Sequence, residues 1–103
     1  MTLIRIHTTL PDTATAKTVA AALLQARLVA CAHIAPAGLS LYTWNGTAEE
    51  SAEVMLWLKT TTDRAAEAVA ELARLHPYDC PMILTDQVAA NPPYAAWVAE
   101  QTT

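Results

Sequence analysis

His76 is the side chain of this sequence best placed to do chemistry. It follows the end of a predicted helix, where the last carbonyl groups favour a positive charge, and Pro77 fixes the backbone just after it. A neutral imidazole nitrogen at this position could bind copper or zinc. The position equally suits a histidine that only hydrogen-bonds the helix end, and the sequence alone leaves both interpretations open.

An acidic cluster follows an Asn-Gly pair in the middle of the chain. Its members are Glu49, Glu50 and Glu53, and the alternation of a strand places Glu49 and Glu53 on one face. The cluster could bind a hard cation weakly, although it lacks the loop of alternating carboxylates that wraps calcium. The alternative is a solvated strand end whose charges prevent uncontrolled pairing with other strands.

Lys59, Tyr42 and Trp44 form a third candidate group. If they meet in a cleft between subunits, a desolvated lysine and two aromatic walls could hold a small anion or a planar ligand. The alternative assigns the two aromatic rings to packing at an interface, and Lys59 to an ion pair with a carboxylate.

No set of residues predicts an enzyme. Cys31 lies in an apolar stretch without a neighbour that would activate its thiol, and it does not form a C-x-x-C pair with Cys80. We therefore expect two buried, reduced cysteines. His7 and His33 are lone histidines on predicted strands. With only two glycines the chain has no glycine-rich phosphate loop, and we expect no organic cofactor.

Length and charge limit the class of protein. The 103 residues predict one domain spanning residues 1–103. A net charge of −4 without a Lys/Arg cluster argues against nucleic acid, and no apolar run approaches the roughly 20 residues of a membrane span. The start of the chain lacks a secretion signal, so we expect a cytoplasmic protein. Charged residues reach only 16%, which suggests that partners cover part of the surface.

The pattern of apolar residues predicts the elements that position these side chains. We expect strands at 3–8, 29–44, 47–59 and 82–88, and helices from 13 to about 27, from 64 to 76 and from 92 onward. The second strand should be kinked or bulged at Pro36-Ala37-Gly38, and Asn45-Gly46 should close a two-residue hairpin. That hairpin pairs Trp44 with Thr47. The helix caps are predicted at Asp12-Thr13, Asp63 and Asn91.

This order predicts an α+β, ferredoxin-like βαββαβ sandwich with an antiparallel sheet, a long central hairpin and an extra C-terminal helix. Both main helices should cover one face of the sheet. Met55 and Trp57 point to the other face, where an exposed apolar patch normally marks an interface. We therefore expect other copies of the chain to bury that face.

Several blocks of the sequence resemble the CutA divalent-cation tolerance family. They cover nearly the whole chain in register: residues 26–34, Tyr42-Thr43-Trp44-Asn45-Gly46, residues 53–60, Leu75-His76-Pro77-Tyr78-Asp79-Cys80-Pro81 and residues 91–97. The resemblance implies a ferredoxin-like homotrimer similar to PII signalling proteins, a link to copper and other divalent metals, and no enzymatic reaction.

The resemblance also implies a metal site at His76 and Glu53. Thr8 stands where the family has a cysteine, Leu75 where some members have another histidine, and Met82 where an acidic residue is common. With these ligands missing, a divalent cation such as copper should be held weakly, or with help from a neighbouring subunit. The alternative is a PII-like sensor that binds a small anionic ligand between subunits through Lys59.

Overall fold

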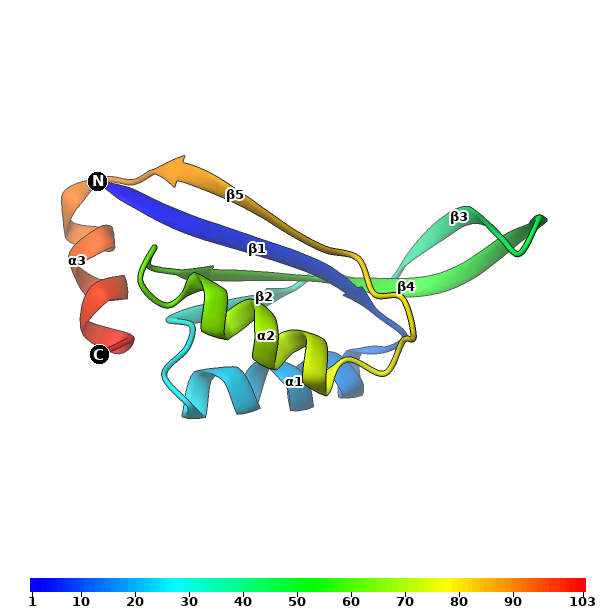
Figure 1. Cartoon of the computed structure of the whole chain (residues 1–103), viewed down its shortest axis with the longest axis horizontal. Coiled ribbons are helices and arrows are strands. Elements are labelled where there is room, and N and C mark those ends of the chain that lie inside the picture. The colour runs from blue at the N-terminus through cyan, green and yellow to red at the C-terminus, as the bar shows by residue number, and fades with distance from the viewer.

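The elements of the computed structural model, which describes residues 1–103, follow the predicted order (Figure 1). Five strands and three helices succeed one another along the chain: β1 (Thr2–Leu10), α1 (Thr13–Gln25), β2 (Cys31–Ile34), β3 (Gly38–Trp44), β4 (Thr47–Thr60), α2 (Ala65–Leu75), β5 (Ile83–Ala89) and α3 (Pro92–Gln101).

The strands form one antiparallel sheet with the order β2-β4-β1-β5, and β3 pairs with the outer half of β4. Helices α1 and α2 lie side by side against one face of this sheet (Figure 1). This is the strand order of the ferredoxin-like βαββαβ fold, so the predicted fold class is confirmed. The extra helix α3 packs at the end of the sheet where β1 begins, through Ala95, Val98 and Leu3.

A β-bulge separates β2 from β3, as the sequence predicts. Ile34 pairs with Leu56 and Gly38 pairs with Glu53, so residues 35–37 face only residues 54 and 55 of β4. One extra residue is therefore inserted opposite β4, at the predicted Pro36-Ala37-Gly38 segment. The amide of Ala35 still donates to the carbonyl of Met55 at 2.9 Å, which keeps the two parts of the ladder together.

The hairpin of β3 and β4 extends beyond the body of the molecule (Figure 1). Asn45 and Gly46 have φ values of 50° and 77°, as a tight turn with two left-handed residues requires. The predicted pairing of Trp44 with Thr47 is confirmed, and the same register pairs Tyr42 with Glu49 and Ser40 with Ser51. Residues 41–50 are all exposed, so nothing within the chain covers this ribbon.

The core lies between the sheet and the two helices. Alternate side chains of β1 and β4 enter it together with one stripe of α1 and two residues of α2: Ile4, Ile6, Leu10, Val54, Leu56, Leu58, Ala16, Val19, Ala20, Leu23, Ala68 and Leu72. Burial of these apolar groups supplies most of the stability, because each fully buried large aliphatic side chain contributes about 1.5–3 kcal/mol.

The other face of the sheet, which we call the open face, is only partly covered. Met55 and Trp57 are half-buried there. The ring of His7 stacks on Trp57 with centroids 4.0 Å apart, and the Arg5 guanidinium lies 5.2 Å from the same ring. Arg5 also pairs with Asp86 at 2.7 Å. Side chains of the chain itself thus shield Trp57 in part, and no helix covers it.

The ends of the two main helices confirm one prediction and show that two others are wrong. Asp12 caps α1 as expected, because its carboxylate accepts the amide of Thr15 at 2.7 Å. Asp63 does not cap α2: the N-cap is Arg64, and no side chain bonds the first turn. The chain turns there through residues 62–64, one residue beyond the predicted cap. Helix α1 ends at Gln25 rather than near Arg27, because Arg27 has a left-handed φ of 59°.

The cysteines are free, but only one is shielded. Cys31 is half-buried, and its Sγ lies 3.3 Å from the hydroxyl of Tyr94. Burial and this contact raise the pKa of Tyr94 to about 12. Cys80 is exposed, so the expectation of two buried cysteines is wrong for Cys80, which lies in the loop before β5.

Asp12→Ala should destabilise the protein, since it removes an N-cap acceptor from the first turn of α1. We expect the melting temperature to fall by a few degrees in thermal unfolding followed by circular dichroism. The matched control is Asp63→Ala, which removes a carboxylate that caps nothing and should leave the melting temperature nearly unchanged. An equal loss in both variants would contradict the assigned caps.

Candidate functional site

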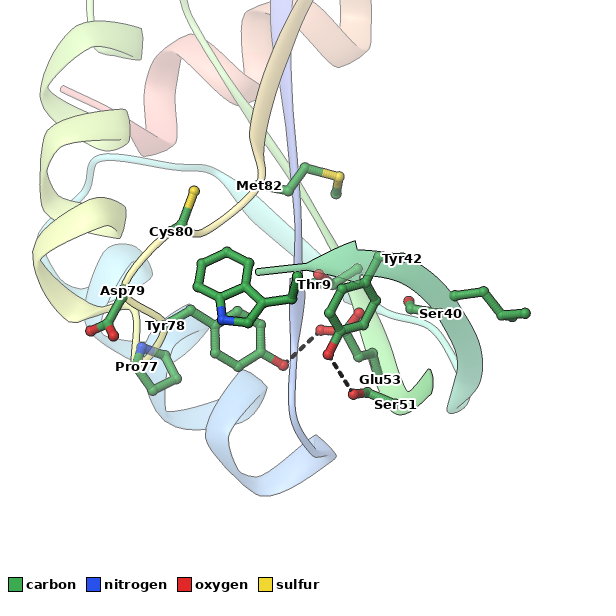
Figure 2. Close-up of a pocket in the computed structure, with 12 residues that line it drawn as sticks. Thr9, Ser40, Tyr42, Ser51, Glu53, Pro77, Tyr78, Asp79, Cys80 and Met82 are labelled. Atoms are coloured by element: carbon green, nitrogen blue, oxygen red, sulfur yellow. Dashed lines mark hydrogen bonds between the residues drawn. The ribbon is translucent and has the colours of Figure 1, made fainter. Parts of the chain in front are cut away.

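A groove of about 650 Å³ lies between the hairpin and the loop that follows α2 (Figure 2). The groove is lined by Thr9, Ser40, Leu41, Tyr42, Trp44, Ser51, Glu53, Pro77, Tyr78, Asp79, Cys80 and Met82. It thus brings together three of the predicted site residues, Tyr42, Trp44 and Glu53. Its lining contains two carboxylates and no lysine or arginine.

Strand alternation places these side chains on one side of the ribbon. Tyr42 pairs with Glu49, Ser40 with Ser51 and Gly38 with Glu53, so every second residue of β3 and β4 faces the same way. The hydroxyl of Tyr42 contacts Oγ of Ser51 at 2.8 Å across the two strands. The ribbon therefore presents aromatic and acidic side chains together on the face that borders the groove.

Glu53 is the carboxylate at the base of this groove. The hydroxyl of Tyr78 donates to Oε2 of Glu53 at 2.6 Å, and Figure 2 shows the two side chains directed toward each other. Burial by itself would raise the pKa of Glu53, but the hydroxyl groups of Ser40, Tyr78 and Thr9 stabilise the carboxylate and hold its pKa below the usual value. Glu53 is therefore ionised at neutral pH.

Tyr78 keeps its proton for the same reason. Burial and the hydrogen bond to Glu53 raise the pKa of the Tyr78 phenol well above its usual value. The phenol is thus a neutral donor to an ionised acceptor, which is among the stronger kinds of hydrogen bond.

His76 lies behind this groove rather than in it. It forms the C-cap of α2, with its backbone amide bonded to the carbonyl of Leu72 at 2.9 Å, and Pro77 keeps its backbone extended. Nδ1 accepts the backbone amide of Tyr78 at 3.2 Å, so the ring proton sits on Nε2. Nε2 then donates to the carbonyl of Thr9 at 2.9 Å.

Thr8 completes the surroundings of this ring. Its Oγ1 lies 3.0 Å from Nε2 of His76, and the threonine is fully buried while His76 is only 8% exposed. Burial lowers the pKa of His76 despite its bond to Thr9 and the nearby charge of Glu53. The ring is therefore neutral at pH 7, with both nitrogens bonded to the chain itself.

In this arrangement His76 and Glu53 do not by themselves make a complete site for a divalent metal ion. Both ring nitrogens of His76 are occupied, and one oxygen of Glu53 is bonded to Tyr78. No group of three or more His, Cys, Asp or Glu side chains is placed to hold a metal. Leu75 and Met82 stand where the family that the sequence resembles has potential metal ligands. Leu75 packs against the core, and Met82 lines the groove.

Lys59 lies far from the groove. It is near the other end of β4, where it pairs with Arg5 of β1 and Cys31 of β2. Within one chain, Lys59 therefore does not meet Tyr42 and Trp44, and their convergence between subunits stays a prediction. Tyr78 is the residue that sequence reasoning missed, although it stands in the His76-Pro77-Tyr78 block that was singled out.

The comparison with known proteins gives a consistent result. The sequence profile described as "CutA1 divalent ion tolerance protein" matches residues 4–101. The divalent-cation tolerance protein CutA of Pyrococcus horikoshii is 39% identical over 101 residues, which cover 97% of this chain and 98% of that protein. A CutA homologue of Xenopus laevis is 34% identical over 95 residues, and the match spans 91% of this chain but 63% of that protein.

The fold has similar solved relatives as well. The solved structure of the periplasmic divalent cation tolerance protein CutA from Archaeoglobus fulgidus superposes on this chain with a TM-score of 0.93 at 26% identity, covering 98% of this chain and 99% of that one. None of the helices α1, α2 and α3 has the length and hydropathy that a membrane-spanning helix requires.

His76→Ala should destabilise the fold, because it leaves the buried Thr8 hydroxyl and the Thr9 carbonyl without their ring partner. We expect a loss of about 1–3 kcal/mol in the free energy of unfolding, measured by urea denaturation. The matched control is His33→Ala on the exposed side of β2, which should change that free energy by less than about 0.5 kcal/mol. If the free energy of unfolding of His76→Ala equals that of the control, the buried hydrogen bonds of His76 do not stabilise the loop between α2 and β5.

Proposed function

This chain belongs to the CutA1 divalent ion tolerance family, and from that premise we propose that it is a homotrimeric, non-enzymatic protein that holds a divalent cation weakly. The single observation that carries the cation-binding role is the ionised Glu53 carboxylate in a groove whose lining has no basic side chain. Such a groove attracts positive charge and repels anions.

Assembly into a trimer is supported by the surfaces that a single chain leaves uncovered. Leu39 and Leu41 on the hairpin are 62% and 69% exposed, and Leu84 on β5 is 53% exposed. An isolated two-stranded ribbon is marginally stable in water, yet this one extends beyond the rest of the protein. Packing against other copies would cover both the ribbon and the open face of the sheet.

Copper is the divalent ion that we propose first, with Glu53 as its principal ligand. His76 ranks second, because its nitrogens are already bonded to the backbone of Tyr78 and Thr9. A single carboxylate is far short of the three or four ligands that a tight copper or zinc site uses. Further ligands would have to come from neighbouring subunits, and the affinity should be low.

The alternative, a PII-like sensor that binds a small anion through Lys59, has less support. The groove carries Glu53 and Asp79, and Lys59 lies at the opposite end of β4. An anionic ligand would need a cleft that only the assembly creates. A cytoplasmic location remains part of our proposal and rests on the sequence alone.

The trimer can be tested by light scattering. The mass in dilute solution should be three times the 11.1 kDa of one chain. Leu41→Asp puts a charge on the exposed ribbon and should shift the protein toward a lower mass, since a buried unpaired charge is costly at an interface. Leu24→Asp, on the exposed side of α1, is the matched control and should keep the trimer mass. A monomeric wild-type protein would refute the proposal.

Cation binding can be tested by calorimetric titration with copper and with zinc. Glu53→Gln should weaken copper binding by about tenfold or more, since it removes the charged oxygen ligand. Glu100→Gln is the matched control, because Glu100 is exposed on α3 and does not line the groove. His76→Ala should weaken copper binding less than Glu53→Gln does, since both nitrogens of its ring are already bonded to the chain. Equal heats for wild type and Glu53→Gln would remove Glu53 from the site.

A further inference from the structure

Two histidines flank Trp57 on the open face of the sheet. The strand registers pair His33 of β2 with Trp57 of β4, and Trp57 with His7 of β1. His7 is paired in turn with Leu84 of β5. Paired residues of neighbouring strands point to the same face, so these side chains form one row on the side that α1 and α2 leave bare (Figure 1). The ring of His7 stacks on Trp57, while His33 is exposed at the edge strand.

The charges beside this row do not compensate for further positive charge. The neighbouring row pairs Cys31 with Lys59, Lys59 with Arg5, and Arg5 with Asp86. Arg5 and Asp86 form an ion pair, whereas Lys59 has no acidic partner within the chain. The thiol of Cys31 contacts the phenol of Tyr94 on α3, which stays neutral because its pKa is raised to about 12. Protonated histidines would therefore add to the positive charge of Lys59.

The proposed homotrimer changes the surroundings of both rings. It covers the open face with neighbouring copies, so His7 and His33 pass from contact with water into an interface. A neutral imidazole can be buried there, but a charged one loses its solvation and is repelled by Lys59. Separated chains leave both rings accessible to water and free to take up protons. Because the separated chains then bind more protons than the trimer, a falling pH favours separation and a rising pH favours assembly.

We propose that His7 and His33 form a pH-sensitive switch that lets the trimer hold together at neutral pH and loosens it in mild acid. The switch rests on the trimer proposed above, because only a neighbouring copy can bury the two rings. Histidine changes its charge between about pH 5 and 8, so the trimer should respond over that range. Since the proposed cation site needs ligands from more than one subunit, loosening the trimer would also release the ion.

The test is light scattering on the full chain over a dilution series at about pH 7.5 and about pH 5. The concentration at which half of the trimer has separated should rise at least about tenfold for each pH unit, because every chain takes up protons as it leaves the assembly. The melting temperature at the same two pH values gives a second readout for a trimer too tight to separate on dilution. For the wild type it should fall by several degrees in acid.

The variant His7→Gln/His33→Gln identifies the source of the pH dependence. Glutamine keeps a polar side chain that does not titrate, so this variant should lose most of the pH dependence of both readouts. It retains His76 and Glu53, and any effect of acid on the groove is therefore common to both proteins. Lys17→Gln, which removes a charge from the exposed side of α1, is the control and should respond to pH as the wild type does. His7→Leu replaces His7→Gln if the glutamine variant does not assemble at neutral pH.

The outcomes separate this switch from the proposed trimer. If the wild type is a trimer that responds to pH no more than the double variant does, the switch is rejected and the trimer stands. The same holds if Lys17→Gln loses as much of the pH dependence as the double variant, since the effect would not come from the open face. A wild-type chain that is monomeric at both pH values would refute the trimer, and the switch with it.

Discussion

The alternation of side chains along β4 is the constraint on which the rest of this structure depends. Val54, Leu56 and Leu58 enter the core beneath α1 and α2, and the residues between them are forced onto the open face. The same alternation continues outward past the end of the core and turns Glu53 toward the groove. One strand thus stabilises the fold, builds an uncovered surface and supplies the carboxylate of the candidate site.

Tyr78 joins the two halves of that site. Its backbone amide bonds His76, which in turn bonds β1, and its phenol bonds Glu53 on β4. The loop between α2 and β5 is therefore anchored to both central strands of the sheet through one residue. The arrangement explains why a histidine that looks like a ligand in the sequence is neutral, buried and already fully bonded.

Local signals in the sequence were enough for most of the fold. Asn45-Gly46 predicted the hairpin because few residue pairs accept two left-handed conformations, and its two-residue length then fixed the pairs across β3 and β4. Pro36-Ala37-Gly38 predicted the bulge. The cap at Asp63 failed, because an acidic residue before a helix is a weak signal when a turn of one further residue is equally compatible with the chain.

The site was less predictable, because it depends on contacts between distant segments. Tyr42, Trp44 and Glu53 were found through strand parity, which is a local property. The bond from Tyr78 to Glu53 spans 25 positions in the chain, and nothing in the sequence states which side chain the phenol meets. Lys59 was correctly placed at the end of its strand, but whether it meets Tyr42 and Trp44 depends on a neighbouring subunit, which local sequence signals do not position.

The bulge at residues 35–37 affects which substitutions the protein can accumulate during evolution. It lets β2 and β3 pair with the same long strand in two different registers, so the part beside the helices and the part around the groove are geometrically independent. Substitutions on the ribbon can alter what the groove accepts without disturbing the packing beneath the helices. In such a scaffold, ligand specificity can change through substitutions that have little effect on the stability of the core.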